Sequence, residues 1–159
     1  MIINFRAYKS SIRGRLAYLT REWKEHDEEK REKVDVFGNK EQFEALHRLN
    51  TNKVKAFVFL VSFREDRDTL QKKLAKYGKP LERLYYEVLE LLTVGYGKDE
   101  VNVFGVGHWD TDNYHFHITV DSRNQLTGTQ LYFERSKKFL EYIRTVEEYI
   151  SLKYGLGYN

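Results

Sequence analysis

The 159-residue chain is 32% charged, with a formal charge of +3 and a pI near 8.9, so a nucleic-acid partner is permitted but not required. It contains no cysteine, which excludes disulfides and thiolate metal sites. No signal peptide and no apolar run of transmembrane length is recognisable, so we expect one domain over 1–159, without membrane insertion and located in the cytoplasm.

Hydrophobic periodicity predicts strands and helices that alternate along the chain. In chain order the predicted elements are a strand over 2–8, a helix over 12–24, a charged loop or helix extension over 25–34, a helix over 39–49, a strand over 54–63, helices over 69–77 and 81–93, strands over 101–108 and 115–120, a loop over 121–129, a short strand over 130–133 and a helix over 134–154. Strands with helices inserted between them favour an α+β domain, in which helices cover a mostly antiparallel sheet. The run 54–63 is nearly all apolar, so we expect a central strand there.

The first predicted helix combines an apolar stripe with basic residues on its other faces. Arg13, Arg15, Arg21 and Lys24 are therefore candidates for contact with nucleic-acid phosphates. Tyr18 lies among them, and its nearest basic neighbour at helical spacing is Arg21. As one of 12 tyrosines, Tyr18 would ordinarily be interpreted as a packing residue.

Other polar residues carry weaker signals. Ser62, near the end of the apolar strand, and Arg123, after the later strand, are two further candidates for DNA contact. The alternative for Ser62 is an ordinary hydroxyl at a strand end. His26 lies in the charge run and has no assigned role, and His47 is interpreted as a surface or packing residue.

Three of the five histidines fall within ten positions of one another. His115 and His117 alternate with apolar residues at the start of a predicted strand, so both imidazoles emerge on the same face. Residues 110–113 are turn-forming and let the chain fold back as a β-hairpin, which brings His108 beside the pair. We therefore expect three imidazoles together on the exposed face of this hairpin.

Three convergent imidazoles with open coordination positions are typical of a catalytic divalent-metal site. Asp110, two residues after His108, is placed to orient an imidazole, which favours that interpretation. Without these two residues, a His-x-His pair on a strand is more often a polar face or a pair of hydrogen-bonding rings. A bound metal would polarise a phosphoryl oxygen, and a tyrosine hydroxyl is a suitable attacking group for transesterification.

The spacing His108-x-Asp110-x4-His115-x-His117 resembles the third motif of conjugative relaxases. These mobilisation proteins nick plasmid DNA at a transfer origin and belong to the HUH (His-hydrophobe-His) endonuclease superfamily. Stretches 17–21, 61–63 and 153–156 are also similar to relaxase sequences, in the same order. The resemblance covers nearly the whole chain and implies a five-stranded antiparallel sheet with the histidine pair on a central strand.

The resemblance also implies roles for particular residues. Tyr18 would be the nucleophile, joined to the scissile phosphate as a 5′-phosphotyrosine and leaving a free 3′-hydroxyl. His108, His115 and His117 would hold Mn²⁺ or Mg²⁺ on that phosphate, and Asp110 would orient a histidine or help to deprotonate the tyrosine. The implied substrate is single-stranded or locally melted DNA at a transfer origin, with conjugation or mobilisation accessory proteins as partners.

Two alternatives remain open. Rolling-circle replication initiators and single-tyrosine transposases share the histidine pair but place their tyrosine on a later helix, where this chain has Tyr142 and Tyr149. Both lie beside the apolar stripe of the last predicted helix, so we interpret them as packing residues. The other alternative is a non-catalytic module that holds single-stranded DNA by stacking and phosphate contact.

Overall fold

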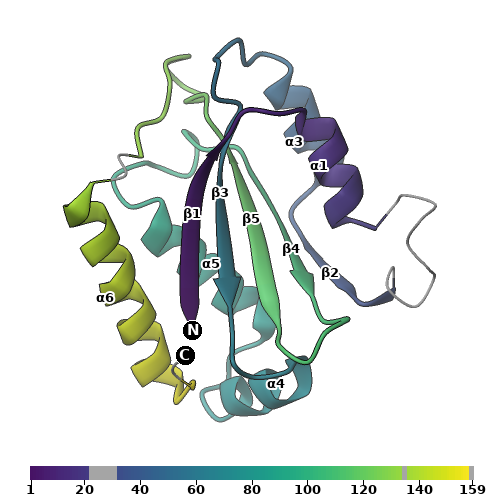
Figure 1. The fold of residues 1–159 in the computed structure, drawn as a ribbon, viewed down its shortest axis with the longest axis vertical. Coiled ribbons are helices and arrows are strands. Elements are labelled where there is room, and N and C mark those ends of the chain that lie inside the picture. Colours follow the sequence, from purple (N-terminus) through teal and green to yellow (C-terminus); the bar gives the residue numbers. More distant parts are fainter. Residues whose placement is uncertain (22–31, 134–135, 158–159) are drawn as a thin grey trace.

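The computed structural model describes residues 1–21, 32–133 and 136–157, and within them five strands form one antiparallel sheet. The strands are β1 (Ile2–Tyr8), β2 (Val34–Phe37), β3 (Ala56–Ser62), β4 (Val103–His108) and β5 (His115–Asp121). Their order across the sheet is β1-β3-β5-β4-β2 (Figure 1). The predicted α+β fold is therefore confirmed, and β5, with the histidine pair, is the middle strand. The apolar strand β3 is interior but lies one position from the middle.

Helices are inserted between the strands and follow them. Their bounds are Ile12–Leu19 for α1, Lys40–His47 for α3, Arg67–Ala75 for α4, Leu81–Leu92 for α5 and Lys137–Tyr154 for α6. Ser11, Asn39, Asp66 and Ser136 each accept a hydrogen bond from a backbone N–H of the first turn, which explains where four of the helices begin. In the described ranges, no helix is long and apolar enough to cross a lipid bilayer.

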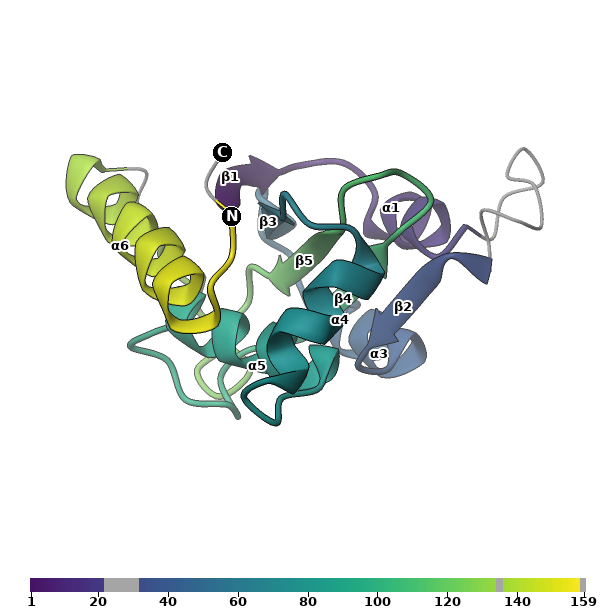
Figure 2. The same ribbon diagram turned by 90° about the horizontal axis from the view of Figure 1, so that it is seen from below.

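The two faces of the sheet differ in their cover. Phe116, Ile118 and Val120 of β5 are fully buried in the main core, to which α4, α5 and α6 also contribute. The alternate residues of β5, including both histidines, point to the other face, where α1 lies (Figure 2). A smaller core of α1, α3 and β4 residues covers part of this second face. The imidazoles therefore lie on the less covered side of a rigid sheet.

Two glycines of β4 leave space for tyrosine rings that pack against the sheet from the side of the main core. At Gly105 a Cβ would collide with the ring of Tyr85, and at Gly107 it would collide with the hydroxyl of Tyr114. The Tyr114 hydroxyl consequently reaches the neighbouring edge strand, where it donates a hydrogen bond of 2.8 Å to Asp35. This contact ties β2 to the hairpin that carries the histidines.

Some element boundaries differ from the prediction. The first helix was expected to reach residue 24, but α1 ends at Leu19, and Arg21 has a φ of 60°, which is incompatible with a continuing helix. Lys24 lies outside the described residues. The second helix was expected to reach residue 49, but α3 ends at His47 and leaves the side chain of Leu49 59% exposed.

The sheet edges also differ from the prediction. The charged stretch 25–34 was expected to be a loop or a helix extension, but β2 begins at its last residue, Val34, and pairs with β4. The predicted short strand over 130–133 is wrong, because within it only Gln130 forms a β-bridge, with Arg123. A single bridge leaves this segment as an irregular connection to α6.

Candidate metal centre

The three histidines of the hairpin converge, as the sequence predicts. Antiparallel pairing of β4 with β5 places His108 directly opposite His115 and Val106 opposite His117. Each ring offers one nitrogen, and these three nitrogens all lie within 4.8 Å of one another. The ring centroid of His108 is 4.7 Å from that of His117 and 5.4 Å from that of His115. One cation could therefore contact a nitrogen of every ring.

Burial keeps these imidazoles uncharged. His108 is only 1% exposed, so the expectation that all three rings lie on an exposed face is wrong for this ring, which α1 covers. Burial lowers the pKa of His108 to about 4 and that of His117 to about 2, and it also lowers the pKa of His115. The neutral imidazole is the form that binds metals, so this donor set fits a divalent cation at neutral pH.

A backbone carbonyl orients the ring of His108. Its Nε2 lies 2.7 Å from the carbonyl oxygen of Leu19, the last residue of α1. Because a carbonyl only accepts hydrogen bonds, Nε2 carries the proton and Nδ1 keeps its lone pair. Such a partner behind a metal-ligating histidine fixes the tautomer and the ring orientation. Nδ1 is therefore the acceptor atom of His108, which Arg21 approaches in this structure and which could instead bind a cation.

Arg21 links the histidines to Asp110. Its Nη2 lies 3.3 Å from Nδ1 of His108 and 3.4 Å from Oδ2 of Asp110. Its guanidinium carbon lies 5.3 Å from the centroid of the Tyr18 ring. The carboxylate of Asp110 was expected to orient a histidine directly, and the structure places Arg21 between the two groups. Guanidinium groups are good donors to phosphate oxygens, so Arg21 is a candidate for phosphate contact at this centre.

Tyr18 opens onto the same groove as His117. The Tyr18 side chain is 45% exposed on α1. It lines a groove of about 380 Å³ together with His117, Leu60, Arg6 and Arg15, among others. The groove therefore brings a phenol and an imidazole that could bind a metal to the same surface, a combination that suits tyrosine-mediated transesterification.

The other candidate DNA contacts are divided between two places. Arg15 lines the groove and donates to the Thr119 hydroxyl at 3.1 Å, and Ser62 lies opposite His115 in the β3–β5 pairing. Arg13 lines a separate cavity at the start of α1. Arg123 follows the far end of β5, roughly 20 Å along the strand from His115 at ~3.3 Å per residue, and it is not part of the histidine centre.

The two C-terminal tyrosines lie on the other side of the sheet. Both are on α6, which packs into the main core behind Phe116 and Ile118, on the face opposite the imidazoles. The Tyr142 hydroxyl donates to the Leu91 carbonyl at 2.6 Å, as expected for a packing residue. Tyr149 is 48% exposed, so the prediction that it packs is not met.

Sequence reasoning missed two residues of the outer face of β1. The ring of Tyr8 lies between two guanidinium groups, with the Arg6 carbon 5.8 Å and the Arg15 carbon 5.2 Å from its centroid. Period-two alternation along β1 already places Arg6 and Tyr8 on one face. Their approach to α1 depends on the antiparallel pairing of β1 with β3, which no local pattern reveals.

Comparison with known protein families identifies a match over most of the chain. The family model "Relaxase: MobA/VirD2-like, nuclease domain" matches residues 18–156, which include Tyr18, Asp110 and the three histidines of the hairpin. No curated protein and no solved structure shows a significant match.

Proposed function

This chain belongs to the MobA/VirD2-like relaxase family, and on that premise we propose that it nicks one DNA strand through a covalent tyrosine intermediate during plasmid mobilisation. The family is one of DNA nucleases, so the proposal concerns the mechanism and the residues. The observation that carries it is the convergence of three neutral imidazoles beside a groove that Tyr18 also lines.

The proposed ligands are His108, His115 and His117, holding Mn²⁺ or Mg²⁺. When bound, such an ion neutralises charge on the non-bridging oxygens of the scissile phosphate. The three side chains come from two paired strands, so the sheet fixes their spacing before any ligand binds. Arg21, beside His108, would contact the same phosphate.

The proposed nucleophile is the phenolic oxygen of Tyr18. It forms a bond to the scissile phosphorus while the bond from phosphorus to the 3′ oxygen breaks. The phenol proton passes to Asp110, and the departing 3′ oxygen gains a proton to become a 3′-hydroxyl. The products are a 5′-phosphotyrosine on the enzyme and a free 3′ end. Attack by that hydroxyl on the phosphotyrosine reverses the step and rejoins the strand.

The proposed substrate is single-stranded or locally melted DNA at a transfer origin, with mobilisation accessory proteins as partners. A single strand fits a groove flanked by Arg6 and Arg15, because guanidinium groups contact phosphates and aromatic rings stack on bases. The position of α6 behind the sheet argues against a nucleophile on that helix, as an initiator or transposase would need. A non-catalytic binding module would not require three neutral imidazoles in contact.

A covalent-trapping experiment tests the proposal. A 3′-labelled pool of single-stranded oligonucleotides is incubated with Mn²⁺, and the denatured protein is analysed for attached label. We expect label on the peptide that contains Tyr18, and no label after chelation with EDTA or in Tyr18→Phe. Tyr149→Phe is a matched control, since Tyr149 is exposed to a similar extent, at 48% against 45%. Label on Tyr142 or Tyr149 would overturn the assignment of Tyr18.

A further inference from the structure

A second polar cavity lies at the other end of the sheet face from the imidazoles. It has a volume of about 460 Å³ and is formed by the connection from β1 to α1, the first turn of α1, the end of α3 and the residue before β3. Its charged or titratable lining residues are Lys9, Arg13, Glu44, His47, Arg48 and Lys55. Four permanent cations therefore face one carboxylate.

The charges of these cations are not compensated locally. Within the described part of the chain, none of Lys9, Arg13, Arg48 and Lys55 has an ion-pair partner within 4.0 Å. Like charges gathered around one cavity repel one another, and an anion in the cavity would relieve that repulsion. The cavity thus has the charge of an anion-binding site.

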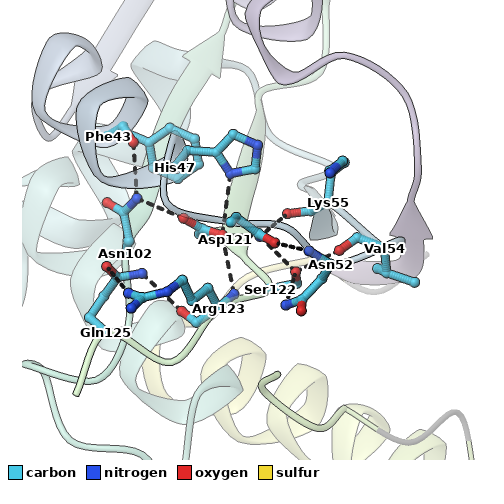
Figure 3. A network of polar contacts seen from close by, with 11 residues as sticks. Phe43, His47, Asn52, Val54, Lys55, Asn102, Asp121, Ser122, Arg123 and Gln125 are labelled. Carbon is cyan, nitrogen blue, oxygen red and sulfur yellow. Dashed lines mark hydrogen bonds and ion pairs between the residues drawn. The ribbon is translucent and has the colours of Figure 1, made fainter. Parts of the chain in front are cut away.

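The buried carboxylate of Asp121 contacts His47, whose side chain lines this cavity (Figure 3). Nδ1 of His47 lies 3.2 Å from Oδ1 of Asp121, although the approach is off the ideal hydrogen-bond angle. Asp121 accepts further hydrogen bonds from Asn50 at 2.6 Å and from Asn102 at 3.1 Å. The His47 ring also stacks on Phe43, with 6.0 Å between centroids and 5° between planes. The ring is therefore held in place at the cavity rather than free at the surface.

Basic and aromatic groups connect this cavity to the groove beside Tyr18. The guanidinium groups of Arg6 and Arg15, both in the groove, flank the ring of Tyr8. The next residue, Lys9, already lines the cavity, and the backbone N–H of Lys55 donates to the Tyr8 carbonyl at 2.8 Å. Along β5, the distance from His117 to Asp121 is only about 13 Å at ~3.3 Å per residue. One DNA strand can span that distance with a few nucleotides.

We propose that the cavity bounded by Lys9, Arg13, His47, Arg48 and Lys55 binds a backbone phosphate of the same DNA strand, a few nucleotides from the scissile phosphate. This inference rests on the proposed function for the identity of the strand. It assigns Arg13 to this second site and gives His47 a role that its sequence context did not suggest. The strand is held at two points on one sheet face, which sets its direction across the histidine centre.

Binding of oligothymidylate tests this site independently of cleavage. Affinity is measured by fluorescence anisotropy in EDTA, in the Tyr18→Phe background, for single strands of about 24 nucleotides, longer than the footprint of one small binding domain. The test variant is Arg48→Gln with Lys55→Gln. The matched control is Arg83→Gln with Lys98→Gln, since those cations are exposed on other elements and do not line the cavity.

We expect the test variant to bind about tenfold more weakly than its parent. The slope of log affinity against log salt should fall by about 1.4, because two cations that face the DNA backbone are removed and each contributes about 0.7. Lys9→Gln alone should lower the slope by about half as much. Equal affinity of the test and control variants for the single strand would overturn the site. The same measurement is made with duplex DNA, and a loss of duplex binding without a loss of single-strand binding would also overturn it. Because no metal or cleavage is involved, failure of Tyr18 as the nucleophile would leave this result unchanged.

Discussion

The two ends of β5 each carry a buried polar cluster, and the clusters differ in what they leave unsatisfied. At the Asp121 end, side-chain amides of Asn50 and Asn102 and the N–H of Arg123 all donate to one carboxylate. At the histidine end, three imidazole nitrogens face one another within 4.8 Å. The first cluster is a carboxylate surrounded by donors of the chain itself, whereas the second brings together neutral nitrogens that can jointly accept a cation. Hydrogen-bond partners thus distinguish a buried polar group that stabilises the fold from one that is a candidate for a functional role.

The largest expected effect is at the histidine end. His117→Gln removes one of the three proposed metal ligands. Loss of a side chain that only orients a ligand costs up to about 100-fold in activity, so we expect nicking to fall by at least about 100-fold. Its free energy of unfolding in EDTA should change by less than about 1 kcal/mol, because a polar side chain of similar size remains. Gel-based nicking assays and urea denaturation measure the two quantities. Retention of Mn²⁺-dependent nicking would contradict the proposed role of this ring.

The opposite pattern is expected at the other end of the strand. Asp121→Ala leaves the amides of Asn50 and Asn102 buried without their acceptor, so the free energy of unfolding should fall by about 3 kcal/mol. Asp112→Ala, in the exposed hairpin turn, is the control and should change it by less than about 0.5 kcal/mol. Urea denaturation compares the two variants. A loss at Asp121 no larger than at Asp112 would show that the network does not stabilise the fold.

The stability that Asp121 contributes should also depend on pH. Burial alone would raise the pKa of Asp121, but the close contact with His47 and hydrogen bonds from Asn102, the Arg123 N–H and Asn50 hold it below its usual value. Its stabilising contribution is therefore complete above about pH 4 and is lost as the pH falls through the lowered pKa. The difference in unfolding free energy between the wild type and Asp121→Asn should narrow below pH 4. A constant difference down to about pH 2 would contradict the lowered pKa.

The smallest effect is expected behind the sheet. Tyr142→Phe removes the hydrogen bond to the Leu91 carbonyl and should lower the free energy of unfolding by about 1 kcal/mol. The amount of covalent DNA adduct should not change, since this hydroxyl is on the face opposite the imidazoles. Thermal denaturation and the trapping assay measure the two properties. Loss of the adduct would favour the C-terminal nucleophile of an initiator or transposase.

The part of the centre that sequence predicts is the part with local periodicity. His115 and His117 share a face because they are two residues apart on a strand, and His108 returns to them across a short turn. Four of the five strands and the end of the last helix before Gly155 also follow from residue patterns, which depend on neighbours in the sequence. The number of strands in the sheet was implied by the family resemblance.

What sequence does not predict depends on long-range contact. The burial of His108 under α1 and its bond to Leu19 join residues 89 positions apart. The positive φ of Arg21 ends the first helix early, although arginine is normally a good helix former. β2 has four residues and is a strand because β4 is available as a partner. Likewise, Asp121 binds His47 only after β5 and α3 have come together.

The carbonyl of Leu19 has a consequence for how the enzyme can move. It belongs to the residue after Tyr18 and accepts the proton of His108, so α1 carries both the proposed nucleophile and the group that orients a proposed ligand of the cation. Displacing α1 from the sheet would shift the Tyr18 hydroxyl and release the imidazole to rotate in the same motion. With the proposed roles, a loosely docked helix would lose metal affinity and nucleophile alignment together.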